Sequence, residues 1–97
     1  MDVDSIDWLE ALGDYARIHA GKNSHVVAQS MQVLERSLPP ALFLRIHRLS
    51  IVRLARIREL HRESDGAGTI VLDTGLRLRG ARGRWEALQA ALEMDTC

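Results

Sequence analysis

The chain has 97 residues, of which 46% are hydrophobic and 27% charged, and thirteen Lys and Arg residues balance thirteen Asp and Glu residues. This length fits a single domain, residues 1–97 with a core from about residue 6 to residue 92, and the composition excludes intrinsic disorder. No apolar run exceeds four residues, which excludes a membrane-spanning helix. Because Cys97 is the only cysteine and the opening residues are acidic, we expect no disulfide framework, no secretory signal and a cytoplasmic location.

The first third of the chain predicts strands followed by a helix. Runs rich in β-branched and aromatic residues, separated by glycine and polar turns, predict strands at residues 6–11, 15–19 and 25–27. A helix follows over residues 31–38, because Met31, Leu34 and Leu38 recur at helical spacing. Ser30 can cap its start, and two prolines end it.

After the prolines the pattern returns to strands, at residues 43–47, 50–54, 69–72 and 76–79, whereas residues 57–62 fit a strand or a helix. A last helix over 85–92 follows from the spacing of Trp85, Leu88 and Leu92. The sequence therefore predicts a β-dominated α+β fold with about six to nine short strands, one mid-chain helix and a C-terminal helix. We expect Trp8 and Trp85 to pack in its core.

The neutral total hides an uneven distribution of charge. Residues 36–62 hold seven arginines against Glu59, a net charge of +6, and residues 75–84 hold four arginines and no acid. Twelve of the thirteen cations are arginine, whose guanidinium forms paired hydrogen bonds with phosphate oxygens and guanine edges. Such segments attract a polyanion even when the whole chain is neutral. The same arginines also fit solvated strand faces and ion pairs, so the charge pattern by itself leaves both interpretations open.

The residues that a catalytic or metal site needs are scattered. The four histidines lie apart, with no cysteine or acidic residue at metal-ligand spacing: His19, His25, His47 and His61. The sequence contains no nucleophile motif and no glycine-rich phosphate-binding loop. It therefore predicts no enzyme, no cofactor, no metal and no small-molecule substrate.

The middle of the chain carries a specific motif. After a helix that ends in Leu38-Pro39-Pro40, the run Phe43-Leu44-Arg45-Ile46-His47-Arg48 continues into Ile51-Val52-Arg53-Leu54. This block resembles the hallmark of the LytTR family, the DNA-binding output domains of bacterial response regulators in two-component systems. Weaker family-like motifs flank it in the right order, at Trp8-Leu9-Glu10-Ala11, Asp73-Thr74-Gly75 and Gly80-Ala81-Arg82. The resemblance covers residues 6–92.

The resemblance implies an elongated, mostly antiparallel β fold and a role in transcription regulation. Family members insert loops between strands into successive major grooves and commonly bind as two copies, which implies promoter direct repeats as the partner and a homodimer on DNA. The reading loops would be residues 13–17, the turn at 47–49 and the segment around Arg82. By position, Arg48 reaches a base edge, whereas Arg45 and Arg17 touch phosphate. The DNA-contacting set implied in this way is Tyr15, Arg17, Arg45, His47, Arg48, Arg82 and Arg84.

Some residues depart from the family pattern. Leu49 stands where a serine usually follows His-Arg, Arg53 replaces an asparagine, and Gly80-Ala81 replaces Val-Ser. The two lost hydroxyls leave open a second interpretation, a degenerate module of the same fold that binds protein through its edge strands. The family domain usually follows a receiver domain, whereas Met1 lies only a few residues before this fold, so the sequence fits a trimmed domain or a free-standing regulator.

Overall fold

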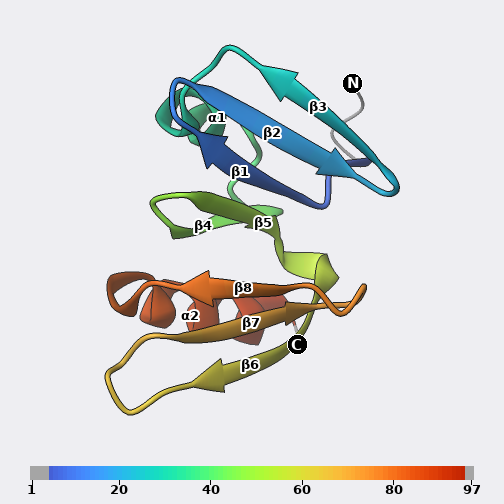
Figure 1. The fold of residues 1–97 in the computed structure, drawn as a ribbon. Coiled ribbons are helices and arrows are strands. Elements are labelled where there is room, and N and C mark those ends of the chain that lie inside the picture. Colours follow the sequence, from blue (N-terminus) through green and yellow to red (C-terminus); the bar gives the residue numbers. More distant parts are fainter. Residues whose placement is uncertain (1–4, 96–97) are drawn as a thin grey trace.

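The computed structural model describes residues 5–95, whose strands form two antiparallel sheets (Figure 1). The five-stranded sheet has the order β3-β2-β1-β5-β4, and the three-stranded sheet has the order β6-β7-β8. The strands are β1 (Trp8–Leu12), β2 (Tyr15–Ala20), β3 (Asn23–Val27), β4 (Phe43–His47), β5 (Ser50–Arg53), β6 (Ile57–Arg62), β7 (Gly68–Leu72) and β8 (Arg77–Gly80). The helices are α1 (Met31–Ser37) and α2 (Trp85–Asp95), with short 3-10 helices η2 (Leu54–Arg56) and η3 (Arg82–Arg84). The predicted β-dominated α+β class and both α-helices are confirmed.

Local sequence signals explain the first hairpins and α1. The β1–β2 and β2–β3 turns each have two residues, and Gly13 and Gly21 come first in them with a φ of 62°. Type II′ hairpin turns place glycine at this position because only glycine adopts that φ at low cost. α1 begins after Ser30, whose hydroxyl accepts a hydrogen bond from the Val33 amide at 3.3 Å. It ends at Ser37, and the C-cap residue Leu38 stands immediately before the two prolines.

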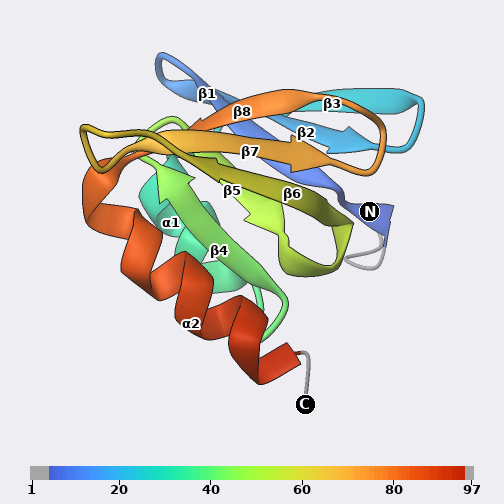
Figure 2. The same ribbon diagram turned by 90° about the horizontal axis from the view of Figure 1, so that it is seen from below.

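Two hydrophobic cores lie on opposite faces of the central strands. The first is covered by α1 and contains Ile6, Leu9, Ala16, Ile18, Met31, Leu34, Leu38, Phe43 and Ile51. The second lies among β4, β5, the three-stranded sheet and α2 (Figure 2), and contains Ile46, Val52, Leu54, Ile70, Leu72, Trp85 and Leu88. Successive residues of β5, Ile51 and Val52, enter different cores because strand side chains alternate between faces. The central strands are therefore buried on both sides.

Trp85, the first residue of α2, is the largest side chain of the second core and is 1% exposed. Its ring packs against β7 and β8 where Gly68 and Gly80 pair across the strands. A Cβ on Gly68 would lie 2.6 Å from the ring, and one on Gly80 3.2 Å from it, so these glycines make the space that the indole fills. The predicted core position is thus confirmed for Trp85. Trp8 lies at the margin of the same core, half-buried and stacked on His19 at 4.2 Å between ring centroids.

Two arginines near the end of β5 hold the start of the fold in place. Arg53 is only 9% exposed, donates from Nε to the Ile6 carbonyl at 2.6 Å, and lies 4.7 Å from the ring centroid of the single phenylalanine. Arg56 forms ion pairs with Asp7 at 2.9 Å and Asp73 at 3.2 Å. Its hydrogen bond to Asp73 and the charges of both carboxylates raise the pKa of the Arg56 guanidinium. Arg53, a departure from the family pattern, is therefore a structural residue.

The structure settles one ambiguity and adds details that the sequence did not predict. Residues 57–62, which fitted a strand or a helix, form β6. The 3-10 helices η2 and η3 were not predicted, and neither was the irregular pairing of β4 with β5 between Arg45 and His47. Within residues 5–95, no helix has the length and apolar character needed to cross a bilayer.

Candidate nucleic-acid interface

Four turns and loops lie along one edge of the molecule, beside the segment that leads from β3 to α1. β1, β4, β6 and β8 all run toward this edge, at the left in Figure 1 and in Figure 2, so the segments that follow them lie there. We call this edge the turn rim; it comprises residues 13–14, 48–49, 63–67 and 81–84. The turns at 21–22 and 73–76 lie at the opposite edge. The three predicted reading loops thus share one rim, although they are far apart in the sequence.

Backbone hydrogen bonds connect the elements that carry the predicted loops. The Ala11 amide, at the end of β1, donates to the Leu49 carbonyl at 2.9 Å. The Ala81 amide, just before η3, donates to the Ile46 carbonyl on β4 at 2.7 Å. The β4–β5 hairpin is therefore bonded to the end of β1, which leads into the first loop, and to the residue before η3, so the strand ends that carry the three loops are held side by side.

Two side chains of β4 hold the β4–β5 turn in shape. Arg45 donates from Nη2 to the Arg48 carbonyl at 2.7 Å, and the Leu49 amide donates to His47 Nδ1 at 3.2 Å. An accepting Nδ1 leaves the proton of a neutral imidazole on Nε2, which is then available as a donor. His47 and Arg45 thus present Arg48 on an ordered turn.

Two of the predicted phosphate contacts already have acidic partners. Arg45 lies 3.4 Å from Glu35 of α1, and its side chain is only 18% exposed. Arg17 lies 3.7 Å from Glu10 on the neighbouring strand, and Glu10 also contacts His19 at 2.8 Å. Arg17 is the third residue of β2 and so lies behind the turn rather than at its tip. Both arginines have a buried Nε without a hydrogen-bond partner among the described residues.

Arg48, Arg82 and Arg84 are exposed on the rim and form no ion pair with any of the side chains that the structure describes, those of residues 5–91. The stem of Arg82 lies against Gly66 of the β6–β7 turn, since a Cβ on that glycine would come within 2.6 Å of Arg82 Cδ. Tyr15 follows the first turn and is 53% exposed. Three of the predicted arginines therefore present their charge to solvent at one edge.

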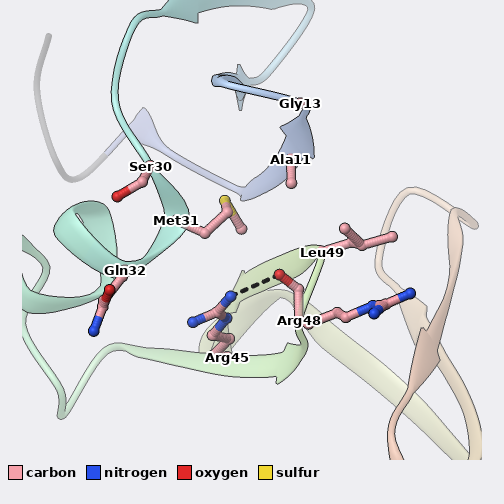
Figure 3. Close-up of a pocket in the computed structure, with 8 residues that line it drawn as sticks. All are labelled: Ala11, Gly13, Ser30, Met31, Gln32, Arg45, Arg48 and Leu49. Carbon is pink, nitrogen blue, oxygen red and sulfur yellow. Dashed lines mark hydrogen bonds between the residues drawn. The ribbon is translucent and has the colours of Figure 1, made fainter.

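A groove of about 390 Å³ separates the first turn from the second (Figure 3). Its lining residues come from β1, the β1–β2 turn, α1 and the β4–β5 turn: Ala11, Gly13, Ser30, Met31, Gln32, Arg45, Arg48 and Leu49. Arg45 lies along its floor in Figure 3, and the Arg48 and Leu49 side chains leave the turn on the side away from α1. The groove is therefore bordered by cationic and apolar groups.

Sequence reasoning missed one arginine that lies directly beside the rim. Arg62 is the last residue of β6, exposed, and without an ion-pair partner within residues 5–91. It precedes the turn that Arg82 contacts. The ambiguity of residues 57–62 hid it, because only a strand ending at Arg62 brings this arginine to the same edge as the predicted loops.

A β-rich domain with turn-borne arginines along one edge is an architecture suited to nucleic-acid binding, and comparison with known proteins identifies the class. The family model of the LytTr DNA-binding domain matches residues 1–93 of this chain. The chain therefore belongs to the LytTr DNA-binding domain family, as the sequence motif indicated.

Two individual proteins illustrate the relationship. The chain is 39% identical over 75 residues to the CO-responsive transcriptional regulator RcoM of Rhodospirillum rubrum, a match that covers 77% of this chain and 31% of RcoM. The chain thus spans about a third of the length of that relative. A solved LytTr DNA-binding domain from Bacillus cereus superposes with a TM-score of 0.85 at 22% identity, covering 95% of this chain and 84% of that one, and shows that the fold is the same.

Proposed function

We propose that this chain is the sequence-specific DNA-binding domain of a transcription regulator and reads successive major grooves through the turn rim. The observation that carries the proposal is the exposure of Arg48, Arg82 and Arg84 on one edge without an acidic partner within residues 5–91. A guanidinium can form two hydrogen bonds with guanine O6 and N7 or with phosphate. Because these three are not already paired, contact with DNA does not first require an ion pair to break.

The residues on the rim and beside it would have different roles in DNA binding. Arg48, at the tip of the β4–β5 turn, would read a base edge, and Arg82 and Arg84 would contact an adjoining groove or its phosphates. Arg45 would act mainly as a positioning residue, because its guanidinium is occupied by Glu35 and the Arg48 carbonyl. His47 Nε2 and the Tyr15 hydroxyl are the additional donors, and Arg17 would reach phosphate only by leaving Glu10.

The relative RcoM is described as a transcriptional regulator, which supports regulation as the outcome of DNA binding. The chain would bind DNA and would catalyse no reaction. A single rim of this size offers few base contacts, and each good bidentate pair is worth about 1–3 kcal/mol. Two copies on promoter direct repeats would supply the rest of the specificity.

The test is a DNA-binding titration across salt concentrations. Duplexes enriched from a random pool by the wild-type protein would be labelled and followed by fluorescence anisotropy. We expect the logarithm of the affinity to fall linearly with the logarithm of salt concentration, by about 0.9 for each phosphate neutralised. Absence of binding at low salt, or a flat salt dependence, would contradict the proposal.

Two variants sharpen the test. Arg48→Ala should reduce affinity for the enriched duplex about 5- to 150-fold, as expected for one bidentate base contact, with a much smaller loss on random duplex. Arg77→Ala is the matched control, because Arg77 is an exposed arginine without an ion pair in residues 5–91 at the opposite edge. If Arg48→Ala lost affinity equally for both duplexes, Arg48 would not read a base.

A protein-interaction module is the competing function, and the free edge strand β3 favours it. Four of its five residues are exposed, and Val26 is 54% exposed. Unpaired edge strands can add a strand from a partner or a second copy. Sedimentation velocity with and without the enriched duplex separates the two functions, since this alternative predicts a protein complex that DNA does not affect.

A further inference from the structure

Leu49 is an apolar residue that the fold leaves about half exposed at a turn. Its side chain is 47% exposed, more than any other leucine with a described side chain, and it belongs to neither hydrophobic core. It follows Arg48 directly at the tip of the β4–β5 turn. Leaving that much of a leucine in water forfeits part of the stability that full burial would provide, so packing within the fold does not account for the exposed part of this side chain.

The turn holds Leu49 in a defined place. Its amide donates to His47 Nδ1 at 3.2 Å, and its carbonyl accepts from the Ala11 amide at 2.9 Å. The carbonyl of the preceding residue is held by Arg45 at 2.7 Å. With the backbone fixed on both sides, little conformational freedom remains to be lost when this side chain meets a partner.

Leu49 is displayed together with an arginine that has no acidic partner within residues 5–91. In Figure 3 the side chains of Arg48 and Leu49 leave the turn on the same side, away from α1. A base edge read by Arg48 would therefore have the leucine next to it. On the floor of the major groove, where Arg48 would read a base edge, the prominent apolar group is the C5 methyl of thymine, whereas phosphate oxygens offer a leucine no apolar contact.

We propose that Leu49 is a specificity-determining residue that contacts the methyl group of a thymine beside the base read by Arg48. This inference rests on the proposed DNA-binding function and adds to it a preference for one base chemistry. The loss of the family's serine hydroxyl at this position is then an exchange of a polar contact for an apolar one. The turn would select a guanine and a neighbouring thymine as a pair.

The experiment removes the methyl group alone. The wild-type protein enriches duplexes from a random pool, and each thymine of the enriched site is then replaced, one at a time, by deoxyuracil, which keeps every hydrogen-bonding group. Transfer of one methyl group to apolar surroundings corresponds to about a fourfold change in affinity. We expect one thymine per copy at which the wild-type protein loses about fourfold and Leu49→Ala loses nothing further.

Control variants and outcomes keep this test separate from the test of function. Leu76→Ala removes a leucine that is 38% exposed at the opposite edge and should retain the wild-type response to deoxyuracil. If the wild-type protein enriched no sequence, the proposed DNA-binding function itself would be contradicted. If binding is normal but no thymine is sensitive, or if Leu49→Ala shows the same sensitivity, Leu49 does not read a methyl group. A Leu49→Ala effect confined to self-association would likewise overturn the inference.

Discussion

Truncation of Trp85 tests whether the second core supports the turn rim. The indole is 1% exposed and lies against Gly68 and Gly80, so Trp85→Ala leaves a cavity bordered on one side by two glycines, which have no side chain to fill it. Loss of a buried tryptophan costs about 3–5 kcal/mol. For a domain of this length each kilocalorie lowers the melting midpoint by about 4–8 °C, so we expect a decrease of at least about 12 °C.

Far-UV circular dichroism during heating is the appropriate assay, because removing a tryptophan changes the fluorescence signal itself. Gln89→Ala serves as the control, since Gln89 is exposed on the same helix and should change the midpoint by only a few degrees. A decrease of less than about 4 °C for Trp85→Ala would refute the reasoning. It would mean that the surrounding strands collapse onto the space, contrary to the rigid packing inferred from the paired glycines.

Three further substitutions address other parts of the structure. Gly68→Ala would place a Cβ 2.4 Å from the His61 carbonyl oxygen, so urea titration should show a loss of roughly 1–3 kcal/mol, whereas an unchanged midpoint would mean that the strand can shift. Arg53→Met removes the hydrogen bond to the Ile6 carbonyl and should lower the free energy of unfolding by about 1.5–3 kcal/mol in the same titration. This is the full value of a charge-assisted hydrogen bond, which applies because the site is buried. A wild-type stability would show the contact to be dispensable. Arg45→Gln should weaken binding to the enriched duplex without changing the salt slope, and a slope reduced by about 0.9 would instead make Arg45 a phosphate contact.

The sequence was sufficient for elements with strong local signals. The strands at 15–20 and 43–47 and the helix at 31–37 lie within one residue of the predictions, because alternation, helical spacing and prolines act over a few neighbours. The family motif then identified the class of fold. Residues 57–62 stayed ambiguous because a short run of mixed charged and apolar residues satisfies both periods.

The site was harder to predict because its properties depend on distant residues. Nothing local distinguishes Arg45, which reaches Glu35 on another element, from Arg48, which has no acidic partner among the described residues. The burial of Arg53 depends on the carbonyl of Ile6, 47 residues earlier. The positions of the proposed reading loops were inferred from the motif, whereas the pairing of each arginine required the tertiary structure.

The two cores share strands, which has a consequence for how the domain unfolds. β5 contributes Ile51 to one core and Val52 to the other, so neither core can disperse while its neighbour stays intact. The domain should behave as one cooperative unit, with amides of the central strands exchanging with solvent only through global opening. A destabilising substitution in the second core would then lower the fraction of molecules with an ordered β4–β5 turn. The apparent DNA affinity would therefore fall with global stability, even for substitutions far from the rim.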